Sequence, residues 1–293
     1  MKNYIKLLRI HQWVKNVFVF APLFFSGNFF HENLLLRSLY AFVFFSMVSS
    51  SIYIINDYMD IETDKIHPKK KHRPLASGAI PKTGAVIAFF VLILITIINM
   101  WAGQKYFDIS LSRFFLVTGF YFVMNLAYSF KLKQIAIVDV CIISFGFVLR
   151  VASGGFATGI FISQWAILLT FVLALFLALG KRRGELITVS HTEKGRKSLE
   201  GYSIQFADVA LSLSVSIGII SYLMFTLTPE IQGRFGHNVF YTFVFVVFAF
   251  LRYLQQTIVY NHTESPTKTA YKDRYIQITI LLWIISFMVL IYV

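Results

Sequence analysis

The stretch NDYMDIETDKIHPKKKHRPLASG, residues 56–78, directly follows a long apolar run. It places four acidic side chains within eight positions, Asp57, Asp60, Glu62 and Asp64, and then a group of basic residues. Such a charged segment after an apolar run is typical of a helix that leaves a membrane. Whether the whole chain belongs in a membrane depends on the composition outside this stretch.

The composition favours a protein that crosses a membrane several times. Of 293 residues, 57% are hydrophobic and 14% are charged, whereas soluble domains carry about 25% charged residues. Long uncharged windows recur along the whole length, which leaves no room for a sizeable soluble domain. We therefore predict an all-α polytopic membrane protein that forms a single domain over residues 1–293.

Windows of about 19 residues give nine candidate transmembrane helices. Their approximate bounds are 15–30, 34–56, 83–101, 111–129, 135–152, 164–180, 204–227, 238–256 and 275–293. The first follows a basic segment but lacks a small-residue cleavage site, so we interpret it as a retained span and not a signal peptide.

The formal charge of +13 follows the expected sidedness of the membrane. With the N-terminus in the cytoplasm and nine spans, 22 of the 27 Lys and Arg residues fall in cytoplasmic segments. The positive-inside rule therefore predicts an inner-membrane protein with a cytoplasmic N-terminus and an outer C-terminus. This accounts for the basic balance, so a nucleic-acid partner is not favoured. The single cysteine, Cys141, is expected to pack in the interior and forms no disulfide within one chain.

The acidic residues need a separate explanation. Asp57, Asp60 and Asp64 are spaced i, i+3 and i+7, so a continuous helix would project all three from one face. Carboxylates grouped in this way suit Mg²⁺, which commonly bridges them to substrate phosphates. The basic residues that follow are Lys69, Lys70, Lys71 and Arg73. We predict a magnesium and diphosphate site; the alternative is a solvated loop that only ends the helix.

The motif itself resembles a known family. NDYMDIETD followed by HRPLASG is similar to the first aspartate-rich motif, N-D-x-x-D-x-x-x-D, of the UbiA superfamily of intramembrane prenyltransferases. The pattern carries over to Asn56, Asp57, Asp60 and Asp64, and the resemblance covers essentially the whole chain. It implies a bundle of about nine helices with a central cavity open to the cytoplasm, in which these aspartates hold Mg²⁺ and a substrate diphosphate.

The second family motif, D-x-x-x-D after the sixth span, is missing. The chain has LGKRRGELITVSHTEKGRKSLEGY there, residues 179–202. Its only early acid, Glu185, lies beside Lys181, Arg182 and Arg183. Such a loop suits phosphate binding better than the chelation of several metal ions.

Two further stretches resemble one subfamily. LLRIHQWVKNVFVFAPLFF, residues 7–25, and YSFKLKQIAIVDVCIISFGFVLRVASGG, residues 128–155, are similar to decaprenyl-phosphate phosphoribosyltransferases. The resemblance implies transfer of 5-phosphoribose from 5-phosphoribosyl 1-diphosphate to a polyprenyl phosphate, with release of pyrophosphate. The products of that subfamily supply pentose donors, such as arabinan precursors, for the cell envelope.

Other ionisable and polar residues are weaker candidates. Asp139 and Arg150 are eleven residues apart, about three helical turns, so both would face a cavity or form interhelical salt bridges. The remaining substrate-binding candidates are Lys15, Asn16, Tyr128, Lys131 and Lys133. Each of them could instead anchor the chain at the membrane interface.

Two other functions remain open on the sequence alone. A conventional UbiA-type prenyltransferase, moving a prenyl group from its diphosphate to an aromatic or quinone-precursor acceptor, would also need the first motif. A transporter could use the aspartates for a coupling ion, although no inverted repeat is evident. The seven histidines form no H-x-x-x-H or H-E-x-x-H motif, so zinc hydrolysis is not indicated.

Overall fold

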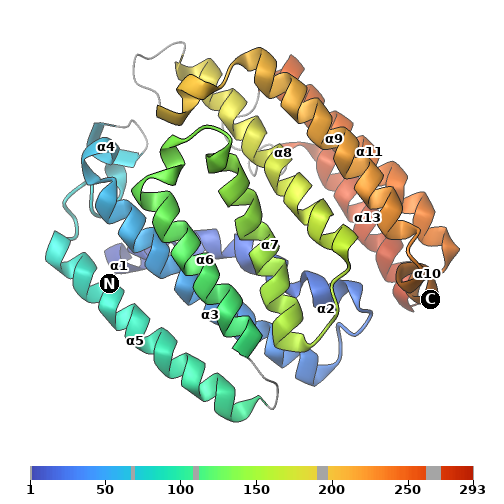
Figure 1. Cartoon of the computed structure of the whole chain (residues 1–293), viewed down its shortest axis with the longest axis horizontal. Coiled ribbons are helices and arrows are strands. Elements are labelled where there is room, and N and C mark those ends of the chain that lie inside the picture. The colour runs from blue at the N-terminus through green and yellow to red at the C-terminus, as the bar shows by residue number, and fades with distance from the viewer. Residues whose placement is uncertain (1, 67–69, 108–111, 190–196, 262–271, 293) are drawn as a thin grey trace. The chain divides into compact units, whose positions relative to one another are not determined.

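The computed structural model describes residues 2–66, 70–107, 112–189, 197–261 and 272–292. Every regular element in these ranges is helical, which confirms the predicted all-α fold (Figure 1). The chain divides into two compact units: residues 1–132 with 149–161, and residues 133–148 with 162–293. That the whole chain acts as one catalytic domain stays a prediction.

The first unit is organised around its longest helix, α3 (Glu32–Met59), which contacts α5, α6 and η1. Its other elements are α1 (Lys2–Leu7), η1 (Ile10–Phe20), α2 (Ala21–Phe25), α4 (Ile61–Ile66), η2 (Lys70–His72), α5 (Lys82–Tyr106), α6 (Ser112–Phe130) and the end of α7 (Val138–Thr158). The core is aromatic: Phe45 stacks on Tyr121 with ring centroids 4.5 Å apart, and Phe44 packs on Phe114 at 5.3 Å. Such pairs add to the energy of apolar burial.

The second unit contains a pair of long helices, α8 (Gln164–Val189) and α9 (Ile204–Thr226), which lie side by side (Figure 1). Its other elements are η3 (Leu132–Gln134), the start of α7, η4 (Lys197–Gly201), α10 (Pro229–Phe235), η5 (His237–Thr242), α11 (Phe243–Leu254), η6 (Gln255–Val259) and α13 (Arg274–Tyr292). Phe176 packs on Phe250 and Tyr253 in its core.

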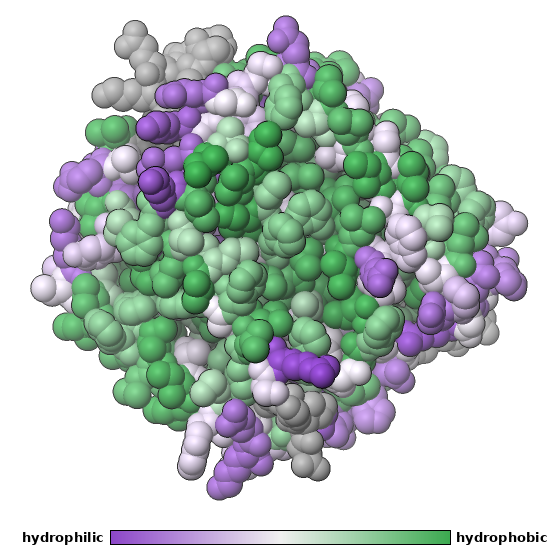
Figure 2. Space-filling model, in the orientation of Figure 1, coloured by the Kyte–Doolittle hydropathy of each residue, from purple (hydrophilic) through white to green (hydrophobic). Residues whose placement is uncertain are grey.

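Apolar side chains also cover much of the outer surface, as Figure 2 shows. On α5, Ile87, Phe90, Leu94 and Ile98 follow helical spacing, and each is 58–64% exposed. Exposure of this much apolar area to water would be unfavourable, so these side chains contact lipid. In the described part, six helices are long and apolar enough to cross a membrane. The protein is therefore an integral membrane protein, while the count of nine spans and the direction of the termini stay predictions.

The first predicted span, 15–30, is wrong as a single helix. The chain forms the 3-10 helix η1 up to Phe20 and then a separate short helix, α2. Pro22 lies in the first turn of α2, where its missing N–H costs nothing. Gly27, with φ 74°, follows the end of α2. Pro22 restricts the backbone and Gly27 permits a left-handed conformation, so together they interrupt a segment that hydropathy alone predicts as one helix.

Gly154 in α7 provides a test of packing within the first unit. A Cβ atom at this position would overlap the carbonyl oxygen of Val19 in η1. We expect Gly154→Ala to destabilise the protein by about 1–3 kcal/mol because backbone atoms must move apart. The matched control is Gly119→Ala in α6, where nothing lies within 4 Å and the gain in helix propensity should make the change neutral or slightly stabilising. Thermal unfolding in detergent measures both; equal melting temperatures would contradict the close contact.

Candidate functional site

The first aspartate motif lies at the junction of α3 and α4. Helix α3 ends at Met59, Asp60 is its C-cap with φ −95° and ψ 7°, and α4 begins at Ile61. The backbone bonds Asp60 N to Asn56 O (3.0 Å) and Asp64 N to Asp60 O (2.8 Å) persist across the junction. The helix is therefore not continuous as the spacing assumed, but the chain keeps its direction well enough for Asp57 and Asp64 to remain on one side.

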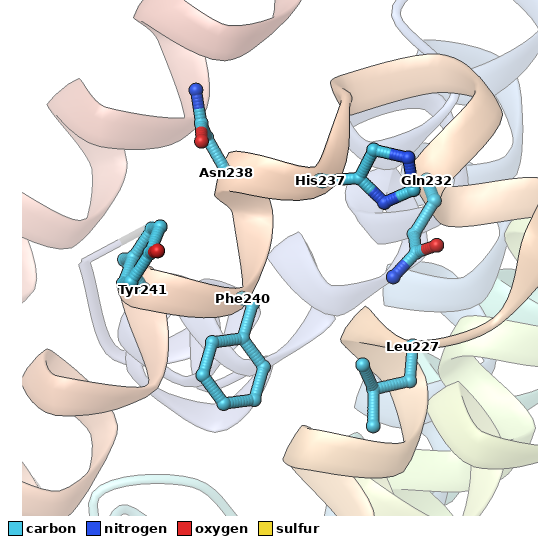
Figure 3. A pocket seen from close by; sticks show the side chains of 6 residues that line it. All are labelled: Leu227, Gln232, His237, Asn238, Phe240 and Tyr241. Atoms are coloured by element: carbon cyan, nitrogen blue, oxygen red, sulfur yellow. The ribbon is translucent and has the colours of Figure 1, made fainter.

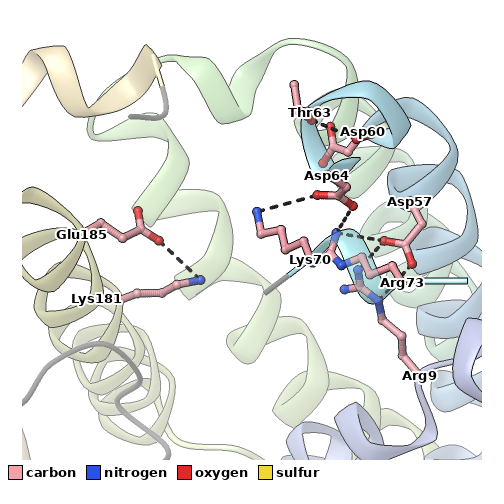
Figure 4. A network of polar contacts seen from close by, with 9 residues as sticks. All are labelled: Arg9, Asp57, Asp60, Thr63, Asp64, Lys70, Arg73, Lys181 and Glu185. Atoms are coloured by element: carbon pink, nitrogen blue, oxygen red, sulfur yellow. Dashed lines mark hydrogen bonds and ion pairs between the residues drawn. The ribbon is translucent and has the colours of Figure 1, made fainter. Parts of the chain in front are cut away.

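Two arginines hold these carboxylates together in what we call the first ion cluster, Arg9, Asp57, Asp64 and Arg73 (Figure 4). Arg73 Nη1 lies 3.1 Å from Asp57 Oδ1 and 2.5 Å from Asp64 Oδ2. Arg9 binds both oxygens of Asp57, with Nε 3.2 Å from Oδ2. Lys70 adds a weaker contact, 4.0 Å from Asp64 Oδ1. Because the Asp57 and Asp64 side chains are 2% and 3% exposed, their ionised forms depend on these cations.

The donor set can be compared with what a metal ion requires. Among the described residues, no group of three or more His, Cys, Asp or Glu side chains could hold a metal ion. Asp60 lies at the helix break beside Thr63 (Figure 4), and the contacts of Arg73 are to Asp57 and Asp64. Asn56, which precedes Asp57 in the sequence, has a buried Oδ1 atom with no hydrogen-bond partner among the described residues. Two carboxylates and one orphaned amide oxygen fit Mg²⁺, which takes few protein ligands and completes its shell with water and substrate oxygens.

The second unit holds its own buried carboxylate in the second ion cluster, Asp139, Arg182, Glu185 and Tyr202. Asp139 is fully buried and accepts a 2.7 Å hydrogen bond from the Tyr202 hydroxyl. Arg182, 1% exposed, has Nε 3.4 Å from Asp139 Oδ2 and also binds Glu185. Asp139 thus forms the interhelical salt bridge that the sequence left open. Burial, together with the bond to Asp139, raises the pKa of Tyr202 because both disfavour the charged phenolate.

The neighbouring basic residues of α8 have different partners. Lys181 Nζ lies 3.8 Å from a Glu185 oxygen (Figure 4). Arg183 is 4% exposed and binds Asp208 at 2.5 Å and Asn261 Oδ1 at 2.8 Å. It also donates to the carbonyl oxygen of Thr257 at 2.7 Å. Arg183 therefore ties α8 to α9 and to the end of η6, which is a structural role.

Arg150 is buried in the first unit among neutral groups. It donates to Asn16 Oδ1 and to the Tyr121 hydroxyl, both at 2.8 Å, and stacks over the rings of Phe45 and Tyr121. Asn16 in turn donates to Ser46 at 2.9 Å. Asn16 is only 1% exposed, so the structure links it to Arg150, and its predicted contact with phosphate stays a prediction.

The other substrate-binding candidates lie nearer the surface. Lys131 is exposed, whereas Lys15, Tyr128 and Lys133 are half-buried and have partners. Lys69 lies outside the described residues.

A shallow hollow of about 350 Å³ lies in the second unit at the C-terminal end of α9 (Figure 3). Its lining residues are Leu227, Gln232, His237, Asn238, Phe240 and Tyr241. None of these is an acid, Lys or Arg, so this hollow does not suit a metal and diphosphate.

Sequence reasoning did not include Arg9, Tyr202 or Asp208 among the site residues. Arg9 belongs to a basic segment that is fully explained by membrane orientation, and Tyr202 and Asp208 follow a loop with no recognisable acidic motif. One signal was available: a buried acid such as Asp139 requires a donor, and Tyr202 is the aromatic residue that ends the adjacent loop.

Arg73 allows the energetics of the first ion cluster to be tested. Arg73→Met leaves Asp57 and Asp64 buried with one cation fewer, so we expect a loss of about 3–5 kcal/mol in unfolding free energy. Adding Asp64→Asn should recover part of this loss because it removes the uncompensated charge. The control is Lys65→Met, which breaks an exposed pair with Glu62 and should cost less than about 1 kcal/mol. Thermal unfolding in detergent measures all three; additive losses in the double variant would argue against coupling.

Curated relatives match the chain over nearly its full length. The chain is 34% identical to a decaprenyl-phosphate phosphoribosyltransferase from Mycolicibacterium smegmatis, with 96% of this chain and 89% of that protein covered. A decaprenyl-phosphate phosphoribosyltransferase from Corynebacterium glutamicum is 32% identical, with 99% and 86% covered.

The fold has solved neighbours as well. The structure of a UbiA homologue from Archaeoglobus fulgidus bound to DMAPP and Mg²⁺ matches with a TM-score of 0.68 at 18% identity, covering 99% of both chains. The UbiA prenyltransferase family matches residues 17–285. With its aspartate motif in place at the end of α3, the chain belongs to the UbiA prenyltransferase family.

Proposed function

We propose that this protein is a membrane phosphoribosyltransferase that transfers 5-phosphoribose from 5-phosphoribosyl 1-diphosphate to a decaprenyl-type polyprenyl phosphate. The observation that carries the proposal is the match to decaprenyl-phosphate phosphoribosyltransferases at 32–34% identity over 96–99% of the chain. The basic residues of α8 support it, since they stand where a prenyl-transferring relative would be expected to carry a second aspartate motif. The product would serve as a pentose donor for the cell envelope.

The metal assignment follows from the donor set of the first ion cluster. Asp57, Asp60 and Asp64 would hold Mg²⁺, and the buried, unpaired Asn56 Oδ1 is a further candidate ligand. When bound there, Mg²⁺ would supply positive charge to stabilise the departing pyrophosphate. Arg9 and Arg73, which pair with these carboxylates, would bind the phosphate oxygens of the donor.

The reaction itself requires little proton transfer. The bond between the anomeric carbon and the pyrophosphate oxygen breaks, and its electron pair leaves with the pyrophosphate. An oxygen of the lipid phosphate forms the new bond to that carbon. Because this oxygen is already anionic near neutral pH, no strong general base is needed. The protein therefore contributes mainly by binding and orienting two anions and by stabilising the leaving group.

The basic residues divide between the two anions in this proposal. Lys69, Lys70 and Arg73, which follow the aspartate motif in the sequence, would bind the donor, and Lys15 and Lys131 would bind the lipid phosphate. Lys133 and Arg182 of the second unit are further candidates for phosphate binding. If the N-terminus is cytoplasmic, the soluble donor reaches these residues from the cytoplasm. This orientation is favoured because it places 22 of the 27 basic residues in cytoplasmic segments. A homo-oligomer is compatible with this arrangement and not required by it.

The proposal is tested by incubating the purified protein in detergent with Mg²⁺, ribose-labelled phosphoribosyl diphosphate and polyprenyl phosphate. We expect label in the lipid extract only when all three are present, and its loss on chelation with EDTA. Label transfer that ignores these components, or activity confined to a prenyl diphosphate with an aromatic acceptor, would overturn the proposal in favour of a conventional prenyltransferase.

Two neighbouring substitutions test the role of the aspartates. Asp57→Asn and Asp64→Asn should each lower kcat by about 100-fold or more because the charge that holds the metal is lost. Glu62→Gln is the matched control: Glu62 lies between them, is exposed and pairs with Lys65, so activity should stay within about 2-fold. Melting temperatures near that of the wild type show that the variants remain folded. Near-normal, Mg²⁺-dependent turnover in both Asn variants would refute the metal site.

A further inference from the structure

Residues with a left-handed backbone lie close to the paired charges of this protein. Among the described residues, three that are not glycine have positive φ: Arg9 at 50°, Ile137 at 68° and Asn261 at 54°. Arg9 binds Asp57, Asn261 binds Arg183, and Ile137 lies two residues before Asp139. Ile137 is the most unusual because a β-branched residue rarely adopts this conformation. Such a conformation persists only where the surroundings impose it.

The surroundings of Ile137 are provided by the residues that precede α9. The Tyr202 hydroxyl accepts a hydrogen bond from the Ile137 N–H at 2.7 Å and donates one to Asp139 Oδ1 at 2.7 Å. One hydroxyl therefore binds both the strained residue and the buried acid. The Tyr202 ring is 7% exposed and packs in the apolar core of the second unit, so the hydroxyl is fixed in place.

A second contact joins η4, the segment before Tyr202, to the turn at Ile137. A Cβ atom at Gly201 would overlap the side chain of Ala136, the residue before Ile137. The backbone of η4 thus lies directly against the turn, which only glycine permits. Ser198, also in η4, lies 3.4 Å from Asp139 Oδ2. The turn and the acid are consequently held from one side by residues 198–202.

We propose that Tyr202 is a positioning residue whose hydroxyl holds the left-handed turn at Ile137 and thereby fixes the start of α7. The turn determines the position of Asp139 relative to Arg182. It also determines the position of Lys133, which lies four residues before Ile137. Loss of the hydroxyl would free the Ile137 N–H and allow the turn to relax to negative φ. The predicted effect on turnover rests on the proposed function, because it assumes that these cations bind phosphate; the effect on the turn does not.

The chain carries a natural reporter of this turn. Cys141 is the only cysteine in the sequence, it is partly accessible, and its N–H donates to the Ile137 carbonyl oxygen at 3.0 Å. Its reaction rate with N-ethylmaleimide in detergent should therefore report a relaxed turn without any substrate. The kinetic readout is kcat and KM for 5-phosphoribosyl 1-diphosphate.

Four variants make the test. Tyr202→Phe should raise the labelling rate of Cys141 and the KM by about 5- to 10-fold each, as expected for the loss of one or two hydrogen bonds. Ile137→Gly, which accepts positive φ without strain, should behave as the wild type. The double variant Tyr202→Phe with Ile137→Gly should recover both values to within about 3-fold, since glycine no longer needs the hydroxyl to keep the turn. Tyr253→Phe is the matched control, because that hydroxyl belongs to the same apolar core but lies against Gly180; it should change neither value.

The outcomes separate the two proposals. A double variant that labels as fast as Tyr202→Phe, or a Tyr202→Phe variant that labels at the wild-type rate, overturns the role of the hydroxyl in holding the turn. If Tyr202→Phe does not fold, Gly201→Ala provides the same test, because it pushes η4 away from Ala136 and should also accelerate labelling; a wild-type rate would overturn the inference. The predicted labelling pattern in a protein that transfers no phosphoribose would support the turn and refute the proposed function.

Discussion

Compensation of buried negative charge by arginine is the constraint on which the rest of this structure depends. The side chains of Asp57, Asp64 and Asp139 are at most 3% exposed in a chain whose outer surface is largely apolar (Figure 2). A carboxylate in such surroundings loses its hydration and needs a cation close by. Arg73 and Arg182 provide it, and their planar guanidinium groups can bind two acceptors at once. The C-terminal end of α3 and the start of α7 therefore each lie within ion-pair distance of an arginine.

Each unit meets this requirement with its own residues. In the first, Arg9 and Arg73 come from either side of α3 in the sequence and meet on Asp57. In the second, Arg182 of α8 reaches Asp139 of α7, and Arg183 reaches Asp208 of α9. Each of these arginines therefore neutralises a carboxylate of its own unit. In the proposed function, Asp57 and Asp64 would hold the metal, and Arg9 and Arg73 would then bind the phosphate oxygens of the donor.

Backbone strain accompanies these pairs for a related reason. Charged side chains must meet within about 3 Å, so the backbone near them adopts whatever conformation permits it. Arg9 and Ile137 take left-handed conformations at the starts of η1 and α7. Both are stabilised by surrounding contacts: Arg9 by Asp57 and the ring of Tyr53, and Ile137 by Tyr202. Strain of this kind is commonly found where a protein positions chemical groups.

The sequence by itself determined the helical class, the membrane environment and the aspartate motif. These depend on local properties: apolar length indicates a spanning helix, and the spacing of Asp57 and Asp64 indicates that they lie on one side of the chain. The basic segment that stands in place of a second acidic motif could also be predicted, because the absence of a motif is evident from the sequence itself.

Only the tertiary structure decided which residues meet. Arg9 binds Asp57 across 48 positions, Tyr202 binds Ile137 across 65, and Arg150 binds Asn16 across 134. It also decided that the first span breaks at α2, that α3 stops at Asp60, and that Ile137 takes positive φ. The physical reason is that charge compensation and close backbone packing depend on distances between elements, whereas hydropathy and spacing describe only neighbours along one helix.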